Sequence, residues 1–521
     1  METGNSKFET RNWKRRSPVS SFQFPASNFE FPNSSFQFFG RLLSFPALLG
    51  ILLVGVTLLF CRSAGLSVPN QESMLHAKIG RDILATRTWP TTDSYSLTAY
   101  GNDCIAFEWL ADLAMASADR LGGLRGQMAL QLVLAAVLVL LLYRLAWQRC
   151  ANPKAAFLAC MPMVPLLAPF LYLRAQLIGV VLLLITLICL ESFRHGHSRV
   201  LWALPAVFLL WVNTHATFVF GLLAVGLYWA CGLTSFRVGG LRAEPWTGRQ
   251  RRDLLMVALL SVLALTVTPY GTRLAAWPLQ VLRVPAGVSA IGEYQPLGAV
   301  PALHKLFLAL LLLFIAALLV VRPEYRVDEV ALLLLGIYAG CLHRRYLLLF
   351  LVVFAPMLAA LLARWVPNYE VAKDRHYLLN AVLILLTCLG ISKLPLSPRE
   401  LQAAVAGAYP EGAVQYLIGH PVPEPMFNED SWGNYLIWRL DGKHKVFVDT
   451  RTGLYEEAGV FQDFVRIMQV DPNTQTLLRK YGIESCLVGR GIPFATLLAA
   501  LPDWEQVYQD NLAVIFVRKR Q

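Results

Sequence analysis

Residues 126–143 read GQMALQLVLAAVLVLLLY, a stretch without a single charged side chain. A helix needs roughly 20 such residues to cross the hydrocarbon core of a bilayer. The stretch therefore predicts a transmembrane helix. The chain as a whole agrees, because 56% of its 521 residues are hydrophobic and only 15% are charged. This composition is typical of membrane proteins with many spans and not of soluble domains.

Similar uncharged runs recur along the chain, and each predicts a further span. The clearest are residues 42–61, 126–143, 155–173, 216–236, 254–272 and 346–363. Shorter runs lie at 175–190, 200–212, 306–321, 330–342 and 378–392. Together they give about 11 spans. We therefore expect a mostly α-helical, polytopic transmembrane bundle.

The basic residues indicate how the bundle is oriented. A net charge of +12 could indicate nucleic-acid binding, but lysine and arginine gather in alternate loops, at 14–16, 149–154, 194–199 and 237–252. This is the positive-inside pattern, so these loops are predicted to be cytoplasmic and no nucleic-acid partner is expected. With an odd number of spans, the loop 62–125 and everything after residue 393 are extracytoplasmic. The protein is predicted to be multi-pass in the inner (plasma) membrane.

The chain divides into three parts. Residues 1–41 are rich in Ser, Asn and Phe, carry a Phe repeat spaced seven apart at 22, 29 and 36, and are expected to form a disordered cytoplasmic tail. Residues 42–393 hold the transmembrane domain. Residues 394–521 have the composition of a small α/β domain. None of the nine cysteines forms a Cys-x-x-Cys pair, so neither a zinc site nor a disulfide framework is predicted.

Within the C-terminal domain, short apolar runs alternate with amphipathic ones. The predicted strands are 425–428, 445–449, 485–488, 505–508 and 513–517. The predicted helices are 411–419, 457–468, 474–481 and 493–501.

Polar residues at the predicted outer ends of spans share one membrane face with the outer loop. In the loop these are Glu72, His76, Asp93 and Glu108; at the span ends they are Arg174, Gln176, Asn213, His215, Glu293, Arg344 and Arg345. Ionisable residues at membrane depth are functional candidates by default, and arginine is suited to binding phosphate. A nearby carboxylate can act as a general base on a hydroxyl. The combination favours transfer of a group from a phosphate-linked lipid.

Each of these residues also has a purely structural interpretation. Arg174, Arg344 and Arg345 could extend to the head groups. His215 could cap a helix end, and Glu108 beside Trp109 could be an interfacial anchor. Glu72 could simply favour a helix start. These alternatives stay open at this level.

The order of the motifs resembles a known superfamily. The outer loop carries Glu72 ahead of His76, then Pro90-Thr91-Thr92-Asp93 and Glu108-Trp109-Leu110. Further on come Arg174-Ala175-Gln176-Leu177, Trp211-Val212-Asn213-Thr214-His215, Thr268-Pro269-Tyr270-Gly271, Trp432-Gly433-Asn434-Tyr435-Leu436 and Val448-Asp449-Thr450-Arg451. Over residues 45–521 the chain resembles bacterial multi-span proteins of the GT-C glycosyltransferase superfamily, whose members use polyprenyl-phosphate sugars.

The resemblance implies a polyprenyl-phosphate sugar donor, an acceptor that the sequence does not identify, and a catalytic acid in the first outer loop. Glu72 is expected to be the base, with Asp93 as the second catalytic candidate. His76, Glu108, Arg174, Gln176, Asn213, His215, Arg344 and Arg345 are expected to bind substrate. Where the family pattern has paired acids, this chain has Asn70-Gln71-Glu72. We therefore predict no metal site, although Asp93 or Glu108 could complete one for a divalent ion.

Two other functions remain open. A transporter or flippase of a lipid-linked glycan would need polar residues near the middle of the bilayer, and the predicted spans contain mostly Leu, Ala and Val there. A non-catalytic assembly protein would tolerate Glu72→Gln, whereas an enzyme would lose about 100-fold or more in rate.

Overall fold

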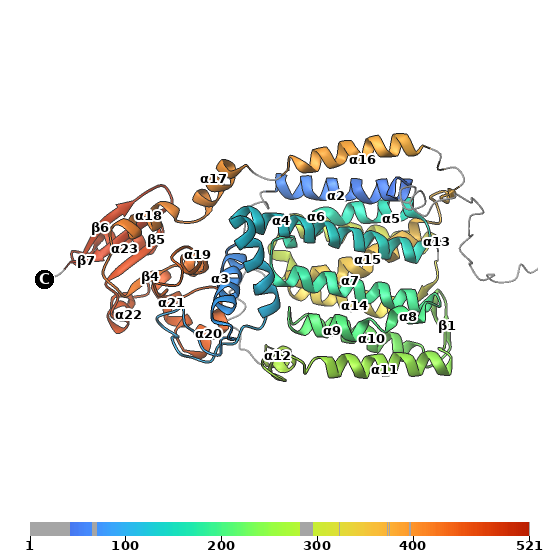
Figure 1. Cartoon of the computed structure of the whole chain (residues 1–521), viewed down its shortest axis with the longest axis horizontal. Helices are drawn as coiled ribbons and strands as arrows, with labels where there is room; N and C mark the ends of the chain where they lie inside the picture. Colours follow the sequence, from blue (N-terminus) through green and yellow to red (C-terminus); the bar gives the residue numbers. More distant parts are fainter. Residues whose placement is uncertain are drawn as a thin grey trace, which may run out of the picture.

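The computed structural model describes residues 42–64, 70–281, 295–321, 323–371, 374, 376–394 and 397–519. The predicted N-terminal tail with its Phe repeat, and Glu293, lie outside the described residues. Figure 1 shows a layer of helices that run side by side, and a smaller unit with a β-sheet beyond one end of them.

The helical layer is an integral membrane domain. Six stretches among the described residues are long and apolar enough to cross a bilayer: α2 (Phe45–Ser63), α4 (Trp109–Cys150), the run from α5 to η2 (Pro153–Phe170), α7 (Ala175–Arg194), α13 (Pro301–Val321) and η6 with α15 (Arg344–Leu362). Three shorter apolar segments are α8 and α9 (Ser198–Val212), α10 (Phe218–Cys231) and α16 (Tyr377–Ser392). All these helices coincide with predicted spans.

Two more predicted spans also form helices in this layer, α11 (Gly248–Ala264) and α14 (Val327–Leu342). Both carry charged side chains in their first turns: Arg249, Arg251 and Arg252 in α11, and Asp328 and Glu329 in α14. The number of spans therefore stays a prediction, while the mostly helical fold is confirmed.

Burial separates the inner helices of the bundle from the outer ones. In α15, Leu347, Phe350, Leu351 and Phe354 are all fully buried. By contrast, only 11% of the α13 span is buried inside the protein. Lipid tails are as apolar as the protein core, so an apolar side chain is as stable against lipid as it is inside the protein. Helix α13 is therefore suited to the bilayer-facing surface.

One end of the bundle carries a small sheet. Strands β1 (Phe236–Val238) and β2 (Leu241–Ala243) form an antiparallel hairpin, and β3 (Tyr325–Arg326) pairs parallel with β2. Figure 1 shows β1 at the end of the bundle opposite the larger sheet. The basic loop around residues 237–252 therefore lies far from the C-terminal unit.

At the opposite end lies the outer loop. It contains α3 (Gln71–Thr86) and the first part of α4, and α4 then bends at Gly122 and Gly123 before it enters the bundle. Gly123 has φ 55° and ψ −139°, a combination that side-chain-bearing residues avoid. A short helix with Pro278, α12 (Arg273–Val281), lies at the same end.

The C-terminal unit contains a four-stranded sheet in the order β4-β5-β7-β6, with β4 and β5 parallel and the other neighbours antiparallel. Its strands are β4 (Met426–Asn428), β5 (Ser485–Gly489), β6 (Trp504–Gln509) and β7 (Ala513–Arg518), and its helices are α17 (Pro398–Ala408), α18 (Glu411–Gly419), α19 (Asp430–Arg439), α20 (Thr452–Glu457), α21 (Phe461–Met468), α22 (Thr474–Lys480) and α23 (Pro493–Ala500). Four predicted strands and the helix 411–419 are confirmed.

Three local predictions in this unit were wrong or incomplete. Residues 445–449 are not a strand of the sheet, because Val446 instead pairs with Ser96 of the outer loop. The predicted helix 457–468 is interrupted at Gly459, which has φ 71°. Helices α17, α19 and α20 were not predicted.

The outer loop and the C-terminal unit are joined by backbone hydrogen bonds. The Leu97 N–H donates to the carbonyl of Val446 over 2.8 Å, and the Val446 N–H donates to the carbonyl of Tyr95 over 3.1 Å. Lys78 of α3 adds ion pairs to Asp82 at 2.6 Å and to Asp441 at 3.2 Å. Because Asp82 lies in α3 itself, the pair with Asp441 is the one that connects helix α3 to the C-terminal unit.

Candidate active site

Glu72 lies in the first turn of α3. The Asn70 side chain caps this helix by accepting a hydrogen bond from the Glu72 N–H, and a carboxylate is favoured at a helix N-terminus. Oε2 of Glu72 is 3.0 Å from Nε of Arg174, the residue that precedes α7. About a third of the Glu72 side chain, 34%, remains exposed. The loop carboxylate predicted to be the base is thus oriented by a predicted phosphate-binding arginine.

The close packing of α3 against α4 brings His76 next to Asp112. Gly80 is buried against α4, where an added Cβ would lie only 2.1 Å from the carbonyl oxygen of Asp112. One helical turn earlier, Nδ1 of His76 lies 2.5 Å from Oδ1 of Asp112. Asp112 is 1% exposed. The missing side chain of Gly80 therefore allows the contact between His76 and Asp112.

Glu108, which precedes α4, lies between two histidines. Its Oε2 is 3.3 Å from Nε2 of His76, and its Oε1 is 3.5 Å from Nε2 of His215. These distances are at or slightly beyond the usual range of an N–H···O bond. The four side chains Asp112, His76, Glu108 and His215 form one continuous row.

Hydrogen bonds fix the tautomer of His215. The Thr217 backbone N–H donates to Nδ1 of His215 over 3.1 Å. Nδ1 is therefore the unprotonated acceptor, and the proton of the neutral ring sits on Nε2. The Thr217 hydroxyl, which accepts from the Trp211 ring N–H over 3.0 Å, is also 3.0 Å from Nδ1. His215 is thereby held with its N–H toward Glu108.

The row has unusual protonation properties. Burial lowers the pKa of His76, but the charges of Asp112, Glu108 and Glu72 outweigh this and raise it to about 9. Burial raises the pKa of Glu108 to about 7, partly opposed by His76 and Arg345. Burial, together with the charges of Arg345 and His76, lowers the pKa of His215 to about 3. Near neutral pH, His76 is a cation, His215 is neutral, and Glu108 titrates.

Other predicted residues hold the segments of this region together. The Asn213 amide donates to the carbonyls of Leu209 and Val267, and its Oδ1 accepts from the Trp109 ring N–H over 2.8 Å. Gln176 donates to the carbonyl of Arg345 over 3.2 Å. Arg345 is also close enough to affect the pKa of both Glu108 and His215. The structure thus brings together most of the predicted site residues from segments far apart in the sequence.

Arg344 lies beside Arg345 in η6, and its backbone N–H donates to the carbonyl of Gln295 over 3.0 Å. Its side chain is partly buried. Arg344 and Arg345 are therefore carried on one short turn at the N-terminal end of α15.

Asp93 has a different environment. Its Oδ1 is 2.7 Å from Nη2 of Arg451, which also contacts Asp449, and its Oδ2 accepts from the Ser96 hydroxyl over 2.6 Å. Burial raises the pKa of a carboxyl group, yet the charge of Arg451 and the bonds from Ser96 make the net shift of Asp93 downward. Asp93 is 2% exposed. Its contacts join the outer loop to the C-terminal unit.

Trp432 and Asp449 of that unit are also buried, at 6% and 1% exposure. Asp449 accepts from the Tyr455 hydroxyl over 2.7 Å as well as from Arg451. Both side chains therefore lie in the interior of the C-terminal unit.

Sequence reasoning missed Asp112. The available signal was its spacing: Asp112 follows Glu108 by four residues at a helix start, so the two carboxylates lie on one face. Its partner, His76, lies 36 residues earlier on another helix, and this distance hid the pair.

The carboxylates of this region do not fit a divalent cation. Such an ion takes several oxygen ligands, but Asp112 and Glu108 face His76 while Glu72 faces Arg174. In the described part of the chain, no group of three His, Cys, Asp or Glu side chains is arranged to hold a metal ion.

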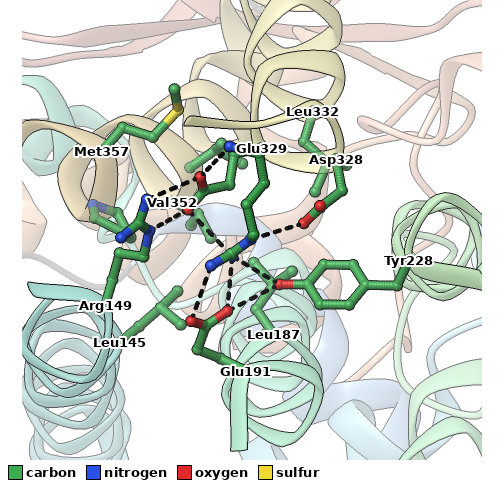
Figure 2. A pocket seen from close by; sticks show the side chains of 13 residues that line it. Leu145, Arg149, Leu187, Glu191, Tyr228, Asp328, Glu329, Leu332, Val352 and Met357 are labelled. Carbon is green, nitrogen blue, oxygen red and sulfur yellow. Dashed lines mark hydrogen bonds and ion pairs between the residues drawn. The ribbon is translucent and has the colours of Figure 1, made fainter. Parts of the chain in front are cut away.

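A second polar cluster lies at the other end of the bundle, around a cavity of about 40 Å³ (Figure 2). Arg326 of β3 makes two bonds to Glu191, of 3.1 and 2.7 Å, and also contacts Asp328 and Glu329. Arg149 pairs with Glu329, and the Tyr228 hydroxyl donates to Glu191 over 3.2 Å. Arg194 pairs with Asp328 at 3.3 Å.

This cluster balances three arginines with three carboxylates. Its members come from α4, α7, α10, β3 and α14. Because the buried charges already have partners within the protein, the cluster is suited to holding these elements together and not to binding a charged ligand.

Several solved structures have a fold similar to that of this chain. The apo structure of an oligosaccharyltransferase from Archaeoglobus fulgidus matches with a TM-score of 0.50 and 11% identity, over 84% of this chain and 69% of that chain. The mycobacterial arabinofuranosyltransferase AftD, as a mutant, also matches at 0.50, with 14% identity, over 92% of this chain and 41% of that one. ArnT from Cupriavidus metallidurans bound to undecaprenyl phosphate matches at 0.49, with 15% identity, over 89% and 97%.

No family model matches the chain, and no curated protein matches it in sequence. At identities this low the structural likeness concerns the fold alone. It confirms the GT-C-like fold that the order of motifs over residues 45–521 had implied.

Proposed function

We propose that the protein is a membrane glycosyltransferase that moves a sugar from a polyprenyl-phosphate-linked donor to an acceptor at the extracytoplasmic face. The observation that carries the proposal is the meeting of Glu72 with Arg174 beside the row Asp112, His76, Glu108 and His215. Transfer of a sugar from a lipid phosphate needs a group that accepts a proton and cations that bind the phosphate. The acidic cluster and the neighbouring arginines at this end of the GT-C-like transmembrane bundle provide both.

In the proposed reaction, an acceptor hydroxyl oxygen attacks the anomeric carbon of the donor sugar. The bond from that carbon to the phosphate oxygen breaks, and its electron pair leaves with the polyprenyl phosphate. The hydroxyl proton passes to a carboxylate of the protein. No metal ion enters this scheme, and the residues act by binding charge and accepting a proton.

Glu72 is our choice for the base. Arg174 orients its carboxylate, and a third of its side chain is exposed to a substrate. Both oxygens of Glu108, by contrast, face histidines. Glu108 with His76 and His215 would position the acceptor and set the local charge. Arg174, Arg344 and Arg345 would hold the departing phosphate, with Gln176 and Asn213 supporting their segments.

We assign Asp93 a positioning role. Its ion pair with Arg451 holds the outer loop against the C-terminal unit. An uncharged Asp93→Asn variant would then lose activity through a displaced loop and would also lose thermal stability. Loss of a base would leave stability unchanged, and this difference separates the two roles.

The topology is part of the proposal. The predicted 11 spans would place the outer loop and residues 394–521 outside the inner (plasma) membrane. The position of the basic hairpin β1–β2 at the opposite end of the bundle from the C-terminal unit supports this orientation. Protease protection of the C-terminal unit in sealed inside-out and right-side-out vesicles tests it, and cleavage from the cytoplasmic side would reverse the assignment.

The decisive experiment measures sugar transfer from a panel of radiolabelled polyprenyl-phosphate sugars in membranes that contain the protein at matched expression. Glu72→Gln is expected to lose about 100-fold or more in rate. Glu505→Gln, at an exposed position of β6, is the matched control and should retain the wild-type rate. If the wild type transfers no sugar from any donor while folded and inserted, a flippase or an assembly protein becomes the better assignment.

A further inference from the structure

The bend in α4 is determined by its glycine residues. Gly122 and Gly123 leave helical geometry, and the two halves of the helix then come together closely. A Cβ on Gly126 would lie 1.9 Å from the carbonyl oxygen of Ala118. Only glycine fits at position 126, so the angle between the two halves is set by backbone contact.

On one side, hydrogen bonds connect the bend to helix α3, close to the candidate active site. Gln127 is fully buried, donates to Asp119 of the first half of α4 over 2.9 Å, and accepts from the Ser73 hydroxyl over 2.8 Å. Ser73 is the neighbour of Glu72. This side of the bend is therefore filled by protein.

The bend also carries an open hollow at the protein surface. A cavity of about 520 Å³ is lined by the two glycines at 122 and 126, by Arg125, and by apolar side chains between Met128 and Val133. A Cβ on Gly122 or Gly123 would meet no atom within 4 Å. Leu121, which precedes Gly122 in the chain, is 88% exposed, the highest value among the large hydrophobic side chains of the described residues.

Charge and depth indicate what fills the hollow. Arg125 lines the hollow, and the side chains of Arg120 and Arg125 are both exposed. The uncharged run of α4 begins at residue 126, so the two guanidinium groups lie at the level where the polar membrane surface meets the hydrocarbon. Arginine at this depth attracts lipid phosphate, while the apolar wall below it suits an acyl chain.

We propose that this hollow binds an anionic phospholipid of the surrounding bilayer, with its phosphate on Arg120 and Arg125 and one acyl chain along Ala129 and Val133. None of the residues that line the hollow belongs to the proposed sugar-transfer site. The inference is therefore independent of the proposed function and stands or falls separately.

The test uses the purified full-length protein with equal amounts of phosphatidylglycerol and phosphatidylcholine that carry the same acyl chains. Native mass spectrometry counts the lipids retained. The wild type should retain phosphatidylglycerol in preference to phosphatidylcholine. Arg125→Gln should reduce this retention about fivefold, and Arg120→Gln should act in the same direction.

Two further variants make the result specific. Ala129→Trp fills the hollow while both arginines remain, and it should also reduce retention. Arg144→Gln removes an exposed arginine further along the same helix, where Arg144 lies over Trp147, and it should leave retention unchanged. If Ala129→Trp does not fold, the arginine variants decide alone.

Equal retention of the two lipids by the wild type would overturn the proposal, as would unchanged retention in Arg125→Gln. A third sample contains added polyprenyl phosphate. If that lipid alone is retained, and phosphatidylglycerol is not, the hollow serves a carrier lipid and the assignment to a bilayer lipid is wrong.

Discussion

Nδ1 of His76 lies 2.5 Å from Oδ1 of Asp112, across the contact between α3 and the first half of α4. On the other side of the same ring, Nε2 faces Glu108. A neutral imidazole carries only one N–H and could donate to only one of these carboxylates. With an acceptor at each nitrogen, the ring is stabilised as a cation, in agreement with its raised pKa.

This relationship predicts how stability depends on pH. The pKa of His76 is about 9 in the folded protein and about 6.5 in an unfolded chain. A raised pKa contributes stability that is fully present below pH 6.5 and is lost as the pH rises through 9. Asp112→Asn removes the main partner, so the loss between pH 6.5 and 9, on the order of 3 kcal/mol, should shrink.

Thermal unfolding of the detergent-purified wild type and Asp112→Asn, measured from pH 6 to pH 10, checks this. His420→Asn is the control for a histidine outside the row, since the His420 ring stacks on Tyr416 in the C-terminal unit. Parallel pH profiles for the wild type and Asp112→Asn would contradict a charged His76.

Gly80→Ala should disrupt the proposed site by moving helix α3, which carries His76, away from α4. The new Cβ would lie 2.1 Å from the Asp112 carbonyl oxygen and 2.8 Å from Cβ of Ala116, so α3 would have to move away from α4. We expect a cost of about 1–3 kcal/mol and a fall in transfer rate, because His76 moves with α3. Gly390→Ala, in open space on α16, should instead be neutral or slightly stabilising. Equal behaviour of the two variants in unfolding and rate assays would argue against close packing at Gly80.

Arg451→Met should loosen the outer loop. It leaves Asp93 and Asp449 buried without their cation, and breaking a buried pair costs about 3–5 kcal/mol. Limited proteolysis should then cut the loop 87–107 faster. Arg466→Met, whose exposed ion pair with Asp463 contributes about 0–1 kcal/mol, is the control. A loop that stays resistant in Arg451→Met would show that other contacts suffice.

Arg326→Met should destabilise the bundle at its other end. Glu191, Asp328 and Glu329 would lose their shared partner, and we again expect about 3–5 kcal/mol. The rate per folded molecule should change little, because the transfer site lies at the opposite end. Arg237→Met, at an exposed pair with Glu324, is the matched control. A loss of rate in Arg326→Met without a loss of stability would point to a functional role for this cluster.

The sequence predicted those parts of the molecule that depend on local pattern. Uncharged runs identified the helices of the bundle because a span needs length and apolarity and little else. The helix 411–419 and the strand at 485–488 also followed from local periodicity. In each case the information lies within about 20 residues.

What the sequence did not reveal depends on partners far apart in the chain. Residues 445–449 have the pattern of a strand, but Val446 pairs with Ser96, some 350 positions earlier. Asp93 has the chemistry of a catalytic acid, and only its pairing with Arg451 indicates another role. Asp112 has its effect through His76 on a different helix. Local patterns contain no information about such contacts.

The pairing of Ser96 with Val446, together with that of Asp93 with Arg451, has a consequence for biosynthesis. The ribosome makes the outer loop early, and it makes Val446 and Arg451, the partners of this loop, only after the bundle helices α2 to α16. The loop therefore gains these contacts after those helices have been synthesised. A nascent chain that stops short of Arg451 would therefore hold the helices α2 to α16 with a loop that lacks its final contacts, so the shape of this loop depends on residues translated long after it.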